Sequence, residues 1–303
     1  MILPYLGRFV CLSLCAFFLT HTVTSLLVSL LAGRAVRSSV SYNPRSAARI
    51  MLWLRLSPMA LAVVVVAGLI TPSYFLFEPR AQTEELSALC VLMSLLGLSI
   101  LIVGLLRGGA AMVRSAIYLR AQQESDAPVI LVAGLFRPRL VVSSRIRRLL
   151  TEQEYAAALR HEEAHGRARD NLKRLLILMS PNFLPFCRGF QALEAGWQRM
   201  AEWAADDCAA QGSTGNALAL ASALIRVGRM NGGHVAIPLG TSLLADTADL
   251  RTRVERLVEA RQDYRQLPQK SAFGVIAAGL AIAIAVSPNL LWAAHRFLEV
   301  LAR

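Results

Sequence analysis

Long apolar blocks alternate with polar stretches along this chain. The first block, residues 9–32, contains no Asp, Glu, Lys or Arg, and His21 is its one candidate charge. Two more uncharged blocks cover residues 56–77 and 86–106, and the short polar stretch 78–85 separates them. About 20 apolar residues in a helix cross the roughly 30 Å hydrocarbon core of a bilayer. We therefore predict three transmembrane helices at 9–32, 56–77 and 86–106, the last two as a hairpin.

A fourth uncharged block, residues 273–292, lies near the C-terminus. A cleaved signal peptide competes with an anchor for the first block, but the block is long for that role and no small-x-small cleavage site stands just before Arg34. The pattern thus predicts a mainly α membrane protein with four transmembrane helices. It divides into residues 1–109 with three spans, a polar domain at 110–270, and residues 271–303 with the fourth span and a short tail.

Arginine positions predict the orientation, because loops rich in Lys and Arg stay on the cytoplasmic side. The loop between the first two spans includes Arg34, Arg37, Arg45 and Arg49, whereas the loop between the second and third has Arg80 beside three glutamates. We therefore expect the N-terminus outside the cell membrane, the 110–270 domain in the cytoplasm and the C-terminal tail outside.

Composition adds little about chemistry. The net charge of +12 permits nucleic-acid binding, but no nucleic-acid module is recognisable, and arginines beside a membrane also contact anionic lipids. Membrane lipids are therefore the expected partners and nucleic acid is not. The five cysteines form no Cys-x-x-Cys pair, and Cys208 is interpreted as a small apolar residue.

Short β-branched runs open the polar domain. Residues 129–132 are apolar, as are residues 140–142 after Arg139, and these two runs flank the turn-like Gly134 and Pro138. This pattern predicts one or two strands, at a sheet edge where proline is tolerated. Such an edge can bind an extended peptide through main-chain hydrogen bonds, although an ordinary structural hairpin fits equally well.

The next predicted helix carries candidate metal ligands and a candidate base. Thr151 and Glu154 form a predicted capping box, and strong helix formers come next. His161 and His165 then lie four residues apart, on one helical face, and can hold one Zn²⁺ with Glu162 as the catalytic base. Glu163 points away and is expected to be solvated or paired with an arginine.

A third zinc ligand must come from another element. Glu202 and Asp206 lie on one face of a later helical stretch. We predict that Glu202 binds the metal and that Asp206 accepts the free N–H of a ligand histidine, His161 in our interpretation. The adjacent Asp207 is an open alternative, as is an acidic surface patch without a metal.

These motifs resemble the glutamate-zincin integral-membrane peptidases, and the most similar pattern is that of the BlaR/MecR-type, beta-lactam sensor-transducer or antirepressor, metallopeptidases. His161-Glu162-x-x-His165 with Asp170, followed by Glu202-x-x-x-Asp206, carries the resemblance. The segments 134–141 and 253–257 are also similar to segments of that family. The resemblance covers most of the chain.

The resemblance implies a cytoplasmic α+β glutamate-zincin domain between the third and fourth spans. It implies a zinc endopeptidase in signal-dependent proteolysis, acting on itself and on a repressor. By position, His161, His165 and Glu202 would bind one Zn²⁺, Glu162 would be the base and Asp206 a supporting residue. Asp170 would make a structural hydrogen bond, since on a continuous helix it lies about 140° around from His165, and Arg253 would support the site or its substrate.

Two departures limit the resemblance. The chain ends soon after the fourth block, so the extracellular penicillin-binding sensor is not expected, and residues 180–185 match the family loosely. The apolar stretch 175–186 fits a buried or interfacial helix better than a fifth span.

Other functions stay open. A heat-shock-type membrane quality-control or processing protease has the same helix pattern, and a non-catalytic membrane receptor with a vestigial zinc site is a third class. The oxyanion partner is open among His234, Tyr264 and Arg253. A second copy of the chain or a separate sensor protein is an open partner.

Overall fold

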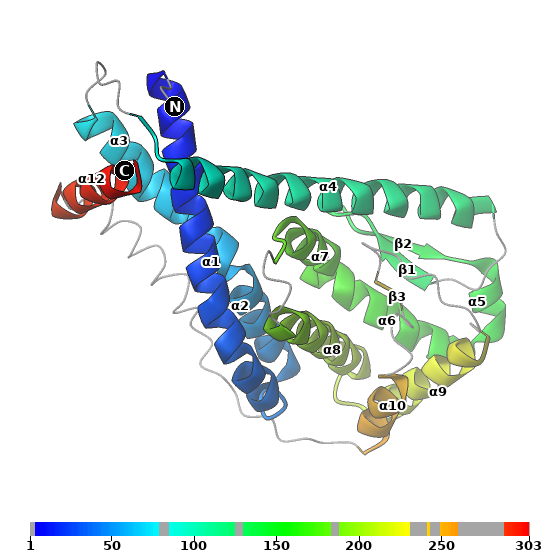
Figure 1. Ribbon diagram of the computed structural model, residues 1–303. Helices are drawn as coiled ribbons and strands as arrows, with labels where there is room; N and C mark the ends of the chain where they lie inside the picture. Colours follow the sequence, from blue (N-terminus) through cyan, green and yellow to red (C-terminus); the bar gives the residue numbers. More distant parts are fainter. Residues whose placement is uncertain are drawn as a thin grey trace.

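The computed structural model describes residues 4–78, 85–124, 130–182, 188–230, 241–242, 249–259 and 288–302. These residues are mostly helical. Both ends of the described chain lie near α3, whereas α9 and α10 lie at the opposite end of the molecule (Figure 1). The elements are α1 (Tyr5–Ser39), α2 (Pro44–Val65), the π-helix η1 (Val66–Ile70), α3 (Thr71–Phe77), α4 (Ala88–Glu124), β1 (Ile130–Ala133), β2 (Arg139–Val142), α5 (Ser144–Leu149), α6 (Glu152–Ala168), α7 (Asp170–Met179), α8 (Arg188–Ala210), α9 (Thr214–Met230), β3 (Thr241–Ser242), α10 (Leu250–Val258) and α12 (Pro288–Ala302).

Three helical stretches of the described chain are long and apolar enough to cross a membrane: Tyr5–Ser39, Pro44–Phe77 and Ala88–Ala121. They overlap the three predicted blocks, and the fold is therefore compatible with membrane association. Each stretch extends past its apolar block. In particular, α4 continues to Glu124, so residues 110–124 prolong the third helix instead of opening the polar domain.

The predicted fourth span at 273–292 lies outside the described residues up to residue 287. From Pro288 the chain forms α12, which continues through Ala302 where we expected a tail. A proline at a helix start is favourable because its missing N–H has no helical partner there. The buried residues Leu291, Ala294 and Leu298 lie on one face, and Ser73 of α3 donates a hydrogen bond to the carbonyl of Leu291 at 2.8 Å.

The predicted strands are confirmed as a hairpin. β1 pairs antiparallel with β2, from Ile130 opposite Val142 to Ala133 opposite Arg139, and with β3 on its other side, in the order β2-β1-β3. Gly134 turns the chain with φ of +99°, which a side chain rarely adopts. β1 is buried, whereas β2 is half-exposed at the edge of the sheet.

The predicted capping box begins α6. Thr151 Oγ1 accepts from the Glu154 N–H at 3.3 Å, and Glu154 Oε2 accepts from the Thr151 N–H at 2.9 Å. α6 ends at Ala168, and the left-handed backbone of Arg169 (φ of 56°) breaks the helix before α7 begins at Asp170. The break redirects the chain immediately after the two histidines.

Two of the apolar clusters surround the elements next to α6 and α8. One joins β1, α5, α6, α9 and α10 around residues such as Ile146 and Leu224. The other joins α1, α2, α7 and α8 around residues such as Met51 and Trp197. α8 packs against the candidate spans α1 and α2 and also against α6 and α9 (Figure 1). It therefore connects the apolar helices to the helix with the histidine pair.

Candidate metal centre

His161 and His165 project from one face of α6, as expected for positions four apart on a helix. Both are buried, and their Nε2 atoms lie 3.2 Å apart. The two Nε2 atoms therefore point at a common position beside α6.

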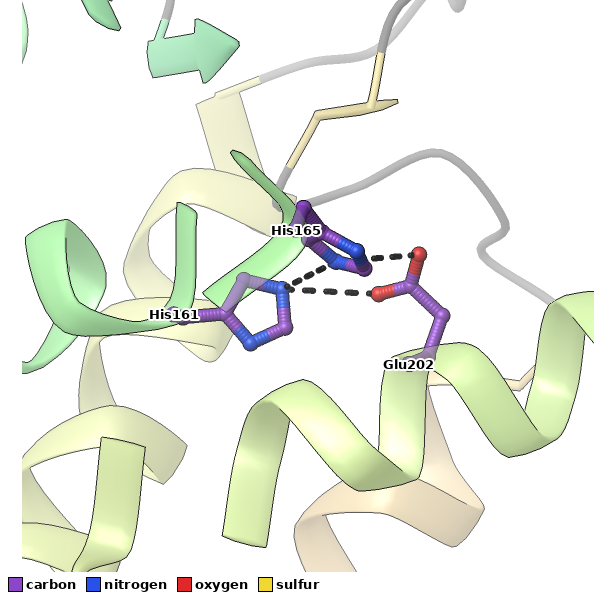
Figure 2. A group of neighbouring side chains, drawn as sticks. All are labelled: His161, His165 and Glu202. Atoms are coloured by element: carbon purple, nitrogen blue, oxygen red, sulfur yellow. Dashed lines mark hydrogen bonds and ion pairs between the residues drawn. The ribbon is translucent and has the colours of Figure 1, made fainter. Parts of the chain in front are cut away.

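Glu202 of α8 faces the same position. Its carboxylate oxygens lie 3.5 Å from Nε2 of His161 and 3.6 Å from Nε2 of His165. Figure 2 shows the two imidazoles from α6 and the carboxylate from α8 directed toward one another. One ligand atom from each of the three residues falls within 4.8 Å of the others, as binding to a single metal ion requires.

The far nitrogen of each imidazole lies beside a carboxylate. Nδ1 of His165 is 2.7 Å from Asp170 Oδ2, at hydrogen-bond geometry, and Nδ1 of His161 is 3.0 Å from Asp206 Oδ1, off the ideal hydrogen-bond line. A proton on Nδ1 leaves the Nε2 lone pair free for a metal, and such carboxylates fix the tautomer and raise the basicity of the ligand.

Asp170 reaches His165 because of the break at Arg169. On a continuous helix Asp170 would lie on another face, and our expected angle assumed that continuity. In the structure Asp170 is the first residue of α7 and turns back to the imidazole, while Lys173 binds its other oxygen at 2.7 Å. Sequence reasoning missed Lys173, whose signal was its position three residues after Asp170.

Glu162, which follows His161 in α6, is buried with no exposed surface. Neither of its carboxylate oxygens has a hydrogen-bond partner among the described residues. Burial raises the pKa of Glu162 to about 7, although the neighbouring histidines act in the opposite direction. The side chain is therefore a buried, unsatisfied carboxyl group that titrates near neutrality.

Arg253 of α10 contacts two carboxylates of the centre. Its Nε and one terminal nitrogen lie 2.9 and 2.7 Å from the two oxygens of Asp206, and its other terminal nitrogen lies 3.1 Å from Glu202 Oε2. Burial alone would raise the pKa of Asp206, but Arg253 lowers it to about 2. The structure places this arginine on the two site carboxylates, and its support of a substrate stays a prediction.

The charges of the centre leave room for a divalent cation. With both imidazoles neutral, Glu202, Asp206 and Asp170 carry three negative charges against the two positive charges of Arg253 and Lys173. Glu162, whose pKa is near 7, adds a further negative charge when it is ionised. Buried charge without compensation is costly. A divalent cation between the Nε2 atoms and Glu202 would offset this negative excess, so the donor set fits Zn²⁺. The six charged residues are Glu162, Glu202, Asp206, Asp170, Arg253 and Lys173.

The other candidate residues lie away from this position. Glu163 is exposed and pairs with Arg167 at 2.8 Å, which confirms the expectation of an arginine partner. Asp207 pairs with Arg256, and Cys208 is half-buried and outside the candidate ligand group. His234 and Tyr264 lie outside the described residues.

Comparisons with family models, with curated proteins and with solved structures give no match for this chain. The assignment of a function therefore depends on the geometry of the centre.

Proposed function

We propose that this protein is a membrane-associated, zinc-dependent endopeptidase. One observation carries the proposal. His161, His165 and Glu202 converge within 4.8 Å, while the adjacent Glu162 is buried with both oxygens unsatisfied. A purely structural zinc site has four protein ligands, whereas a catalytic site has three and keeps a position open. The described residues supply three ligands and a candidate base.

A zinc ion at this centre would act as a Lewis acid that polarises a peptide carbonyl and makes a water molecule more acidic. The protein residues do the rest. Glu162 accepts a proton from the attacking water and later delivers it to the leaving amine. Asp170 and Asp206 hold the imidazoles, and Arg253 holds Glu202 and Asp206.

The hairpin supports a peptide as the substrate. β2 pairs with β1 on one side, and its other edge has no partner strand among the described residues. The hairpin also lies close to α6, since Pro138 and Val132 approach Gly166, the residue after His165. An extended peptide would add to the β2 edge by main-chain hydrogen bonds.

We further propose that the substrate is a regulatory protein of the repressor type, or the chain itself, as the BlaR/MecR-type resemblance implies. The centre would lie on the cytoplasmic side of the membrane, in keeping with the arginines between the first two spans. Co-expression with a neighbouring repressor, followed by a search for its truncated product, tests this substrate separately from the chemistry.

The chemistry is tested by purifying the full chain in detergent, measuring bound zinc and assaying cleavage of itself and of the repressor. Wild type and Glu162→Gln should both hold about one zinc per chain, and only wild type should cleave. Glu163→Gln is the matched control, since it removes an exposed charge one residue away. Undiminished cleavage by Glu162→Gln would remove the base assignment. A chain that binds no zinc would make the centre an ion-pair cluster in which Arg253 is the counter-cation.

A further inference from the structure

A cavity of about 570 Å³ lies where the start of α2 faces α6, α7 and α8. This volume is within the range of small-molecule sites. One carboxylate, Asp170, lines it against four cationic side chains. The cations are Arg45 and Arg49 from α2, Arg167 from α6 and Lys173 from α7.

None of the three candidate metal ligands lines the cavity. Asp170 contacts Nδ1 of His165, whereas Nε2 of the same ring faces Glu202. A cavity that reaches Asp170 therefore lies behind the imidazole, away from the position where a peptide would react.

The charges in the cavity favour an anion. Among the described residues, no carboxylate lies within 4 Å of Arg45 or Arg49, although Asp207 interacts with Arg45 at a longer range. Arg167 pairs with Glu163, but that pair is solvent-exposed and such pairs contribute little. Arginine guanidinium groups bind phosphate through paired hydrogen bonds, so phosphate is the anion that this lining suits best.

The lining becomes apolar toward the membrane helix. Along α2 it runs from Arg45 and Arg49 to Leu52, on a helix that continues into the candidate span Pro44–Phe77. Trp197 and several alanines of α8 form the facing wall. A ligand with an anionic head and an apolar body matches this gradient, and anionic phospholipids have that structure.

We propose that this cavity binds a phosphate group, and its place beside a candidate span points to the headgroup of an anionic phospholipid. Lys173 lines the cavity and also binds Asp170, which in turn contacts Nδ1 of His165. A phosphate bound in the cavity would therefore contact Lys173, and through Lys173 and Asp170 it would be linked to His165. The proposal does not depend on the zinc chemistry, because it is tested by binding alone.

The test is native mass spectrometry of the full chain in detergent, titrated separately with phosphatidylglycerol, phosphatidylcholine and inorganic phosphate. Arg45→Gln/Arg49→Gln should bind phosphatidylglycerol roughly thirtyfold more weakly than wild type, since each arginine contributes about fivefold near a membrane surface. Arg34→Gln/Arg37→Gln removes the same charge from the same inter-span region but does not line the cavity. This control should bind as wild type does.

A second variant separates shape from charge. Ala204→Leu fills the cavity from α8 and leaves all four cations, so it should also lose phosphatidylglycerol, and thermal unfolding will show whether the variant folds. If phosphatidylglycerol binds in an arginine-dependent way and inorganic phosphate does not bind, the ligand is the lipid. If inorganic phosphate binds in this way and phosphatidylglycerol does not, the ligand is free phosphate. Equal binding by the cavity and control arginine variants, or equal binding of phosphatidylcholine, overturns the proposal.

Discussion

At the scale of single residues, the metal centre contains more buried acid than its own cations balance. Glu162 has no hydrogen-bond partner among the described residues, and Glu202, Asp206 and Asp170 crowd around two imidazoles. A protein without a cation can offset this excess only by binding protons. Burial would lower the pKa of His165, but Glu202 and Asp170 outweigh it and raise that pKa to about 10. The pKa of Glu162 is also raised, to about 7.

These shifts predict a pH dependence for the metal-free protein. A group whose folded pKa exceeds its unfolded value stabilises the fold below the unfolded pKa, and this stabilisation is lost as pH rises through the folded pKa. The contribution of Glu162 should therefore be lost between pH 4.5 and about 7, and that of His165 between pH 6.5 and about 10. The melting temperature of chelator-treated protein should fall from about pH 5 to 9.

Zinc should reverse the trend. The ion replaces the protons, so its stabilising effect should increase with pH because the ligands must be deprotonated. Melting temperatures measured with zinc and with chelator at each pH give the stabilisation by zinc. If the difference between the two melting temperatures stays constant or decreases as pH rises, a metal bound by the two histidines is contradicted.

The carboxylate behind His165 gives a second prediction. Asp170→Asn keeps an oxygen that can accept the Nδ1 proton but removes the charge that makes the imidazole basic. Zinc affinity should fall about 10- to 100-fold, as measured by competition with a chromophoric chelator. Glu163→Gln removes one charge from the exposed face of the same helix, so its affinity should not change. Equal affinities in the two variants would leave Asp170 a purely structural residue.

The sequence predicts some of these contacts better than others. The capping box and the histidine spacing are local, so the geometry of α6 follows from neighbouring residues. The Asp170 contact depends on the left-handed Arg169, for which no glycine or asparagine gave a signal. The contact of Arg253 with Asp206 joins residues 47 positions apart and requires the fold of α8, α9 and α10 together.

At the scale of elements, close helix packing depends on glycines in α4. A Cβ added at Gly97 would collide with the carbonyl oxygen of Leu14 in α1. One added at Gly109 of the same helix would meet nothing within 4 Å. Small residues let apolar helices approach closely in this way.

Gly97→Ala should therefore destabilise the protein by about 1–3 kcal/mol, the usual effect of overpacking. Gly109→Ala should be neutral or stabilising by up to about 1 kcal/mol, since alanine is the better helix former. Thermal unfolding in detergent compares the two. If both variants melt together with wild type, α1 and α4 do not pack as described.

Hydropathy locates such helices but not their ends. The apolar block at 86–106 ends at Arg107, yet α4 continues to Glu124 because Ala, Met, Leu and Arg are good helix formers whatever their polarity. The Gly108–Gly109 pair does not stop the helix. Gly108 instead gives room to Met179 at the end of α7, a contact between residues far apart in the chain that no local pattern contains.

At the scale of the whole molecule, the helix that carries Glu202 shares a core with the candidate spans. Phe190, Trp197 and Met200 of α8 pack with Ala32 of α1 and Met51 of α2. Arg55 of α2 adds a 2.7 Å ion pair to Glu194 of α8 and a hydrogen bond to the carbonyl of Ile177 in α7. The division into residues 1–109 and 110–270 followed charge and hydropathy, and neither property reports this packing.

A final prediction concerns residues 110–270 produced without the first three helices. The face of α8 that covers Ala32 and Met51 would then be exposed. This face includes Trp197 and Phe190, which are at most 3% exposed in the full chain. Exposed apolar area of this kind promotes aggregation. We expect the fragment to be insoluble or aggregated, and to bind less zinc than the full chain, because α8 carries the candidate ligand Glu202.

Size-exclusion chromatography, limited proteolysis and zinc analysis of the fragment and of the full chain in detergent check this expectation. The informative control is the fragment with Phe190 and Trp197 replaced by polar residues, which should become more soluble without regaining zinc, since α8 would still lack α1 and α2 to hold it against α6. A monomeric, protease-resistant and zinc-loaded fragment would mean that α6 and α8 hold the centre by themselves. The apolar helices would then act as an anchor and contribute nothing to its geometry.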